Sequence, residues 1–376
     1  MDKKTRLKKA FDLEQPDRPP ILGGWLAAPG YIQALTGCSE DEYWADPFRW
    51  GLEAERVLGS DGVIGIFEPI GRGEYRCVDG QVLRERAAHT LEGIVAWIEA
   101  LPDPKEVETN FALARLTDLP ETLGETIPFI DEASAYAEYA AHLRAKQAQC
   151  GDILWCPADW WVIPKALWYH EFGHENGLML PALYPDHWRK LFRLSAVRAR
   201  QRATLEARAV REGLLPRAML TGEDLCSQQG PMVSPDFLRR EYFPWVEYAI
   251  EPLLAIGSRL VWHSDGNVRP IFDDVLACGF AGFQGFQREC GVDIEWIVER
   301  RTRNGEPLLI FGPLSVTTTL PFGSPEDVRA EARRAMRACR DRASLVFFTS
   351  NTINPDVPLE NIKAYWRAAL ESAWSG

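Results

Sequence analysis

Short apolar runs, each bounded by Gly, Pro or polar residues, alternate along this 376-residue chain with longer amphipathic segments. Such alternation is typical of βα units that build a parallel sheet. The runs predict eight strands, at residues 20–25, 62–68, 152–156, 217–223, 258–263, 279–284, 307–312 and 344–350. Eight buried parallel strands favour a closed (β/α)8 TIM barrel over an open sheet.

Three additions to this barrel are expected. The charged amphipathic opening predicts an N-terminal helix, and residues 75–86 predict a β-hairpin that turns at Asp79-Gly80. Residues 91–149 predict a mostly helical insertion, which we expect to lie with the hairpin over the barrel mouth. No linker-like Pro/Gly/Ser stretch and no internal repeat occurs, so residues 1–376 are predicted to form a single domain.

The composition of the chain excludes some classes of partner and indicates the cellular compartment. The formal net charge of −12 argues against binding to nucleic acid or to an anionic membrane. The chain has no apolar stretch of membrane-spanning length and no signal-peptide core at its start. Its eight cysteines include no CxxC pair. We therefore expect a cytoplasmic protein whose thiols are reduced and mostly buried.

Catalytic groups of a barrel of this kind lie at the carboxyl ends of its strands. His263 and Asp265 leave the end of the fifth strand at positions i and i+2, so their side chains point the same way. Such a pair can hold a metal, or the aspartate can orient the histidine for acid–base chemistry. The alternative is a hydrogen-bonded turn at Asp265-Gly266.

Acidic residues end two other strands. Glu223 and Asp224 follow the fourth strand, where two carboxylates are costly to bury without partners. They are candidates for a metal ligand, a general base or a clamp on a cation, or else for a helix cap and an arginine pair. Glu68 ends the second strand and is a candidate acid, with a salt bridge to Arg72 as its alternative role.

Aromatic and amide side chains complete the expected site. Tryptophans at positions 155, 160, 161 and 168 predict either core packing or an aromatic wall for a ligand. We assign Trp25, Trp155, Trp160 and Gln284 to substrate binding, and Asn351 at the last strand to catalysis. Residues 170–174 (HEFGH) fit the zinc-protease pattern HExxH, but Gly173 weakens the helix and the segment lies within the barrel-like alternation, so packing is the favoured interpretation.

Several segments resemble the uroporphyrinogen decarboxylase superfamily. They are residues 6–19 (RLKKAFDLEQPDRP), 224–235 (DLCSQQGPMVSP), 263–267 (HSDGN), 320–328 (LPFGSPEDV) and 355–362 (PDVPLENI). The resemblance implies a barrel that carries out one of two chemistries. One is cofactor-free decarboxylation of uroporphyrinogen, and the other is zinc-dependent methyl transfer to or from a corrinoid protein.

The sequence departs from both patterns. The stretch that matches the arginine-bearing segment of the decarboxylases, residues 24–31, contains no arginine. Glu68 stands at the decarboxylases' strand-two aspartate, and Asn351 stands near their last histidine. An octacarboxylate substrate is therefore disfavoured. In the methyltransferase pattern of His-x-Cys and a later Cys, this chain has His263 but places Asp265 and Asn351 at the thiolate positions.

Together these features predict a corrinoid-linked, methyltransferase-like enzyme that demethylates a small methoxy-aromatic or methylamine donor. We expect His263, Asp265 and Glu223 to hold zinc, with Glu68, Asp224 and Asn351 as catalytic groups. One alternative is a decarboxylase acting on uroporphyrinogen or a smaller acid, with Arg72 and Arg269 reaching the mouth. The other is a non-catalytic ligand-binding barrel. The sequence leaves a homodimer open.

Overall fold

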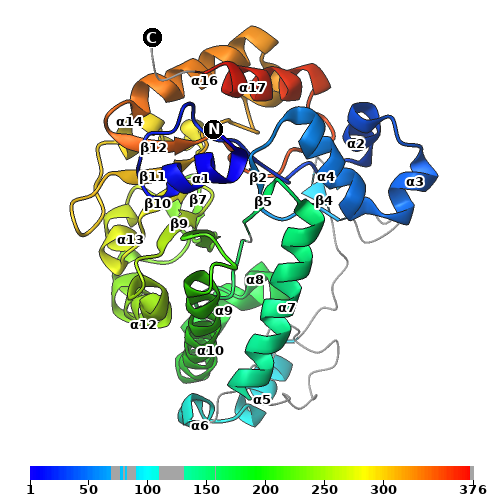
Figure 1. Cartoon of the computed structure of the whole chain (residues 1–376). Coiled ribbons are helices and arrows are strands. Elements are labelled where there is room, and N and C mark those ends of the chain that lie inside the picture. The colour runs from blue at the N-terminus through cyan, green and yellow to red at the C-terminus, as the bar shows by residue number, and fades with distance from the viewer. Residues whose placement is uncertain (69–76, 79–80, 83–89, 110–130, 157, 373–376) are drawn as a thin grey trace.

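The computed structural model describes residues 1–68, 77–78, 81–82, 90–109, 131–156 and 158–372 (Figure 1). No helix among these residues has the length and apolar character needed to cross a membrane.

Eight parallel strands form a closed ring. Five pair in the order β12-β11-β10-β9-β6 and three in the order β1-β2-β5. Parallel bridges between Ile21 and Phe347 and between Ala158 and Leu220 join the edges of these two sheets. The prediction of a (β/α)8 barrel is confirmed, and each strand overlaps its predicted run: β1 Leu22–Gly23, β2 Gly62–Val63, β5 Leu154–Trp155, β6 Ala218–Gly222, β9 Arg259–His263, β10 Gly282–Gln284, β11 Leu308–Phe311 and β12 Ala343–Val346.

Alternate residues of these strands fill the barrel interior. The buried cluster there takes side chains from all the strands except β10: Leu22, Ile64, Cys156, Ala218, Leu220, Val261, Leu309, Phe311, Val346 and Phe348. Leu7 and Phe11 of helix α1 (Lys3–Phe11) join this cluster and close the amino-terminal end of the barrel. Because side chains alternate across a strand, the inward position of Val261 predicts that His263 also points inward.

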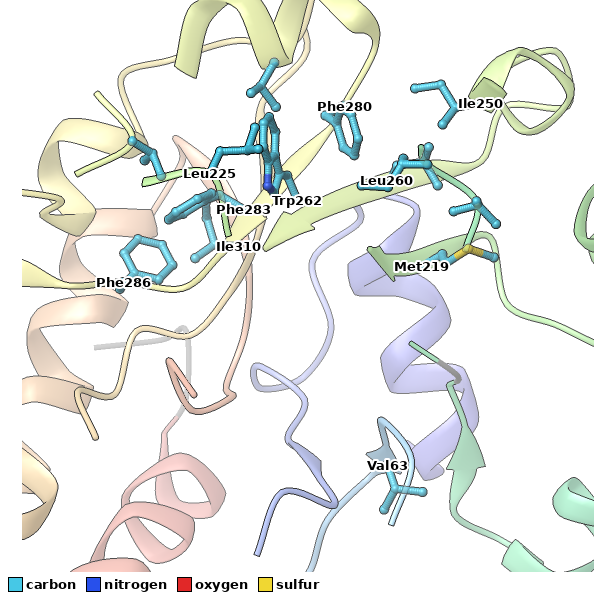
Figure 2. Packing of buried hydrophobic residues seen from close by; sticks show 14 of the residues in the cluster. Val63, Met219, Leu225, Ile250, Leu260, Trp262, Phe280, Phe283, Phe286 and Ile310 are labelled. Atoms are coloured by element: carbon cyan, nitrogen blue, oxygen red, sulfur yellow. The ribbon is translucent and has the colours of Figure 1, made fainter. Parts of the chain in front are cut away.

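The other strand face packs against the outer helices. Figure 2 shows Met219, Leu260 and Phe280 beside Ile250 of helix α12, while Trp262 lies near Phe283. All five of the aliphatic and aromatic side chains Met219, Ile250, Leu260, Phe280 and Phe283 are at most 3% exposed. This outer layer contributes most of the apolar burial that stabilises a barrel of this size.

Helices follow most of the strands. They are α2 Pro29–Thr36, α3 Glu40–Ala45, α4 Pro47–Leu58, α8 Tyr169–Phe172, α9 His174–Leu183, α10 Pro185–Arg211, α11 Pro235–Phe237, the π-helix η1 Leu238–Tyr242, α12 Phe243–Leu254, α13 Phe272–Cys278, the 3-10 helix η2 Arg288–Cys290, α14 Ile294–Ile297, α15 Thr319–Phe322, α16 Pro325–Cys339 and α17 Leu359–Glu371.

The predicted additions are present. Strands β3 (Cys77–Val78) and β4 (Gln81–Val82) pair as an antiparallel hairpin, whose turn lies outside the described residues. The insertion forms α5 (Leu91–Ala100), α6 (Pro104–Thr109) and α7 (Glu132–Cys150), and residues 110–130 between α6 and α7 are not described. Trp97 of α5 packs its ring 6.2 Å from that of Phe172 in α8, so the insertion lies against the segment that follows β5.

A buried ion network ties the opening segment to the barrel. The carboxylate of Asp61, which is fully buried, accepts hydrogen bonds from Arg6 (2.6 Å), Arg18 (2.8 Å) and the backbone amide of Ile21 (2.9 Å). Asp17 holds the other side of the Arg6 guanidinium. These contacts give a structural role to the acidic and basic residues of the opening segment.

Candidate active site

The polar residues of the site lie at the carboxyl ends of β6, β9 and β10. The strand register places Gly222, His263 and Gln284 side by side. Gly222 allows this close approach, because a Cβ there would lie 2.0 Å from the carbonyl oxygen of His263. Asp224 and Asp265 follow two residues after Gly222 and His263.

Gln284 orients the imidazole of His263. The amide nitrogen of Gln284 donates to the carbonyl oxygens of Thr349 (2.6 Å) and Ser350 (2.8 Å), so its amide oxygen faces Nδ1 of His263, to which it is hydrogen-bonded. This network assigns the proton to Nδ1. Both side chains are buried, with His263 7% and Gln284 0% exposed. The remaining nitrogen, Nε2, is directed toward Asp224.

Asp224, His263 and Asp265 form a compact cluster. Each offers one ligand atom, and the three atoms all lie within 4.8 Å of one another. Oδ1 of Asp224 lies 3.5 Å from Nε2 of His263 and accepts a hydrogen bond from the backbone amide of Asp265 at 2.9 Å. The end of β6 is thereby joined to the end of β9.

Asn351 supports Asp265 from the end of the last strand. Its amide nitrogen donates to Oδ2 of Asp265 at 2.7 Å. Burial raises the pKa of Asp265, with His263 lowering it and Asp224 raising it further. Asn351 thus contacts one carboxylate of the cluster rather than standing apart from it.

The donor set of this cluster fits a divalent cation. The carboxylates of Asp224 and Asp265 repel each other and the lone pair on Nε2 of His263. A cation bound by all three groups would remove that repulsion. Carboxylate and imidazole donors suit zinc, manganese or iron, whereas thiolates favour softer metal ions. Histidines that bind a metal through one ring nitrogen typically donate from the other, as Nδ1 of His263 does to Gln284.

Glu223 occupies a different position from the metal-ligand role expected for it. Its carboxylate accepts hydrogen bonds from the backbone amides of Ala166 (2.9 Å) and Leu167 (3.1 Å). Burial raises the pKa of Glu223 to about 7, and the two amides oppose that rise. The three-residue cluster contains Asp224 in its place. Glu223 therefore fixes the segment after β5 that forms the wall of the pocket.

An aromatic cavity of about 300 Å³ opens beside the cluster. Its lining includes Trp160, Trp161, Trp168, Tyr169, Asp224 and His263. The ring of Trp160 lies edge-on to the imidazole of His263, with centroids 5.4 Å apart. Lys165 is the one cation lining this cavity among the described residues; it pairs with Glu171, and its ammonium lies 4.4 Å from the ring centroid of Trp161.

A buried carboxylate anchors this aromatic wall. Asp159 accepts from the backbone amide of Trp161 at 2.8 Å and from Arg202 of α10 at 2.6 Å. Arg202 holds the pKa of Asp159 low despite its burial, and the same arginine contacts Glu206 at 3.3 Å. The segment is thus tied to a rigid helix, which favours a preformed pocket.

The HEFGH segment is not one continuous helix. Helix α8 ends at Phe172, and α9 begins at His174 after Gly173, whose φ is +83°. A single helix face is therefore not available for a zinc pair at positions i and i+4. The ring of His174 stacks on Tyr169 at 4.9 Å, in agreement with the packing role predicted.

Trp25, Trp155 and Glu68 were also predicted to belong to the site, and the structure places each of them in a different environment. Trp25 lies edge-on to His263, with centroids 6.2 Å apart, and donates to the carbonyl oxygen of Ile64. Trp155 packs against Phe48 in the core outside the cavity lining. The carboxylate of Glu68 is about half exposed and lies 3.9 Å from Lys146 of α7, so it belongs to a different surface contact and not to the Asp224–His263–Asp265 cluster.

Sequence reasoning missed the polar members of the pocket wall. Tyr169, Lys165 and Glu171 line the cavity, and the hydroxyl of Tyr169 donates to Oδ2 of Asp224 over 3.5 Å. Burial raises the pKa of Tyr169, with Asp224 and Glu223 adding to that rise, so the hydroxyl keeps its proton. The only feature of the sequence that could have pointed to these three residues is that they closely follow Trp160 and Trp161, which were already candidates.

The comparisons with known proteins agree with this architecture. The sequence model described as uroporphyrinogen decarboxylase (URO-D) matches residues 221–372. A solved methyltransferase from Methanosarcina mazei is similar over 99% of each chain, with 18% sequence identity and a TM-score of 0.58. At that identity the likeness concerns the fold. No curated protein matches the chain.

The fold and site define a (β/α)8-barrel protein whose candidate active site lies at the carboxyl ends of its strands. Residues 221–372 of the chain are similar to the uroporphyrinogen decarboxylase family, and the whole chain shares its fold with the solved methyltransferase.

Proposed function

We propose that this protein is a methyltransferase-like enzyme that removes a methyl group from a small methylated donor. The acceptor that the family resemblance implies is a corrinoid carried by a partner protein. The observation that supports this proposal most is the Asp224–His263–Asp265 cluster at the edge of an aromatic cavity.

The three residues of the cluster would hold one divalent cation. When bound, such an ion would supply a Lewis acid for the heteroatom that carries the methyl group. Gln284 keeps Nε2 of His263 available by binding the Nδ1 proton, and Asn351 holds Asp265 in place. Both are positioning residues, because they act through the side chains that they contact.

The side chains that line the pocket would orient the methyl donor and supply a hydrogen bond to its leaving heteroatom. Trp160 and Trp161 offer ring faces and edges to an aromatic ring or an alkylammonium group. When the bond from the methyl carbon to oxygen or nitrogen breaks, the electron pair stays on the heteroatom. The hydroxyl of Tyr169 lines the same cavity, and by turning its O–H away from Asp224 it would donate a hydrogen bond to that heteroatom.

The charge of the pocket disfavours the decarboxylase alternative. Its one lysine is already paired with Glu171, while Glu223 and Asp224 add further carboxyl groups. Of the two arginines considered for substrate carboxylates, Arg269 contacts the ring of Trp296 and the carbonyl oxygen of Gly291, and Arg72 lies outside the described residues. The described lining therefore offers a polycarboxylate no cationic side chain other than the paired Lys165.

A direct test follows the transfer of methyl groups to cob(I)alamin, with methylamine and 2-methoxyphenol as donors. Methylcobalamin formation is read from the absorbance spectrum, and loss of donor is read by NMR. We expect transfer from one of the donors to fall at least about a hundredfold in His263→Ala and in Asp224→Asn. His187→Ala removes a half-buried histidine of α10 that lies away from the cavity and pairs with Glu99, and it should keep the native rate.

Two results would contradict the proposal. One is equal activity in the native protein and in the His263→Ala and Asp224→Asn variants. The other is decarboxylation of uroporphyrinogen by the native protein without methyl transfer from either donor.

A further inference from the structure

A second cavity lies at the amino-terminal end of the barrel, opposite the Asp224–His263–Asp265 cluster. Its volume is about 850 Å³. Its walls come from α1, the carboxyl-terminal ends of α7 and α10, and the residues that enter β5, β6 and β9. We call it the basal groove, and its lining is Lys4, Lys8, Phe11, Asp12, Leu143, Arg144, Gln147, Ala148, Leu154, Val210, Arg211, Gly213, Leu214, Leu215, Pro216, Arg217 and Ile256.

The basal groove is basic although the protein is acidic. The whole chain has 54 acidic and 42 basic residues. The lining of the groove reverses that balance, with one acid, Asp12, against five bases: Lys4, Lys8, Arg144, Arg211 and Arg217. Such a local excess of positive charge attracts anions, and a concave surface strengthens the attraction.

The cations of the groove are poorly neutralised. Within the described part of the chain, Lys4, Lys8 and Arg144 form no salt bridge, although the charge of Arg144 helps to lower the pKa of Glu212. Asp12 approaches Arg217 only to 4.0 Å. Arg217 and Arg211 otherwise donate to backbone carbonyls, of Ile256 (3.3 Å) and Ala207 (3.4 Å). These like charges therefore repel one another until an anion lies among them.

The floor of the groove is apolar. Leu154, Val210, Leu214 and Ile256 are half-buried, so part of their apolar surface is open to the groove, and the buried Phe11, Leu143 and Leu215 complete the apolar lining. A purely inorganic anion would leave this floor in contact with water. A ligand that carries an apolar body beside its charge would cover the floor and neutralise the rim together.

We propose that the basal groove is a binding site for a small organic phosphate with an aromatic or aliphatic body. The cavity has the size of sites that hold such ligands, which span roughly 300–1,000 Å³. Lysine and arginine side chains are the usual partners of phosphate oxygens. This inference is independent of the methyl-transfer proposal, since none of the groove residues lines the cavity beside His263.

The test is calorimetric titration of the full chain with 1-naphthyl phosphate. We expect binding that weakens at least about tenfold in the double variant Lys8→Glu/Arg144→Glu, because charge-assisted hydrogen bonds are lost. The matched control is Arg337→Glu/Arg367→Glu, which makes the same charge change at exposed positions of α16 and α17. The control should keep the native affinity.

Two partial ligands separate the contributions of charge and apolar contact. 1-Naphthol has the apolar body alone and inorganic phosphate has the charge alone, and each should bind at least about tenfold more weakly than 1-naphthyl phosphate. The proposal is overturned if 1-naphthyl phosphate does not bind at millimolar concentration. It is also overturned if the groove variant and the control lose affinity equally, or if either partial ligand binds as tightly as the whole.

Discussion

The side-chain amide of Gln284 fixes the tautomer of His263, the buried histidine at the end of β9. Its nitrogen is committed to two backbone carbonyls, so its oxygen accepts the Nδ1 proton and Nε2 remains directed toward Asp224. The histidine therefore enters the Asp224–Asp265 cluster already oriented. This relationship underlies the account of the site.

Loss of that orientation should weaken metal binding. In Gln284→Leu the imidazole loses its acceptor, and we expect the affinity for zinc to fall about 10- to 100-fold, as for other outer-shell partners. The measurement is competition with a chelating dye. Gln287→Leu, which removes a neighbouring amide that binds the backbone of Gly266, serves as the control. Equal affinity in the native protein and Gln284→Leu would remove the positioning role.

A buried acid makes stability depend on pH. Glu55 of α4 lies beneath Gly23, where a Cβ would lie 1.9 Å from its carboxyl oxygen, and it binds the amide of Gly24 and the hydroxyl of Ser60. Burial raises the pKa of Glu55 from 4.5 to about 7. The folded state thus retains a proton that the unfolded chain releases between these values, so stability falls as pH rises from 4.5 to 7.

Glu55→Gln should remove this contribution. The slope of unfolding free energy against pH over this window should become less negative, and above pH 7 the variant should gain up to about 3 kcal/mol over the native protein. Urea denaturation at several pH values measures both. The partly exposed Glu53→Gln is the control. A native-like slope in Glu55→Gln would contradict the assigned pKa.

The ion network at the base of the barrel should be sensitive to loss of its acid. Asp61→Asn leaves Arg6 and Arg18 without their buried charge partner, and we expect a loss of about 3–5 kcal/mol in unfolding free energy. Asp273→Asn, at an 88% exposed side chain 3.7 Å from Arg300, should change it by less than about 1 kcal/mol. Similar losses in both variants would contradict the structural role of Asp61.

Trp160 should govern donor binding. Trp160→Ala removes the ring beside His263, and we expect KM for the methyl donor to rise about tenfold with a smaller change in kcat. Trp245→Ala removes a half-buried tryptophan of α12 outside the cavity and is the control. A native KM in Trp160→Ala would show that the aromatic wall does not contact the donor.

The strands and part of the site could be predicted because both follow from local patterns. The apolar runs placed all eight strands, and the i, i+2 spacing placed His263 and Asp265 on one side. From the sequence, Glu223 and not Asp224 was assigned to the metal, whereas the cluster contains Asp224, because Glu223 binds the backbone amides of Ala166 and Leu167 from a distant segment. Gln284 was assigned to substrate for the same reason: its partner, His263, comes from the neighbouring strand.

Residues on long connections were the hardest to place. Glu68 ends its apolar run, yet its position beside Lys146 depends on how α7, the last helix of the insertion, packs. Trp155 and Trp160 are only five residues apart, but one packs in the core with Phe48 and the other faces His263. Hydrophobic pattern alone does not distinguish these two environments.

Metal content of the purified chain tests the central claim most directly. After incubation with zinc and removal of the free ion, elemental analysis should give one equivalent per chain for the native protein and His187→Ala. It should give well below half an equivalent for His263→Ala and for the double variant Asp224→Asn/Asp265→Asn. No bound zinc in the native protein, or equal zinc in all four proteins, would contradict the assignment of this cluster as a metal site.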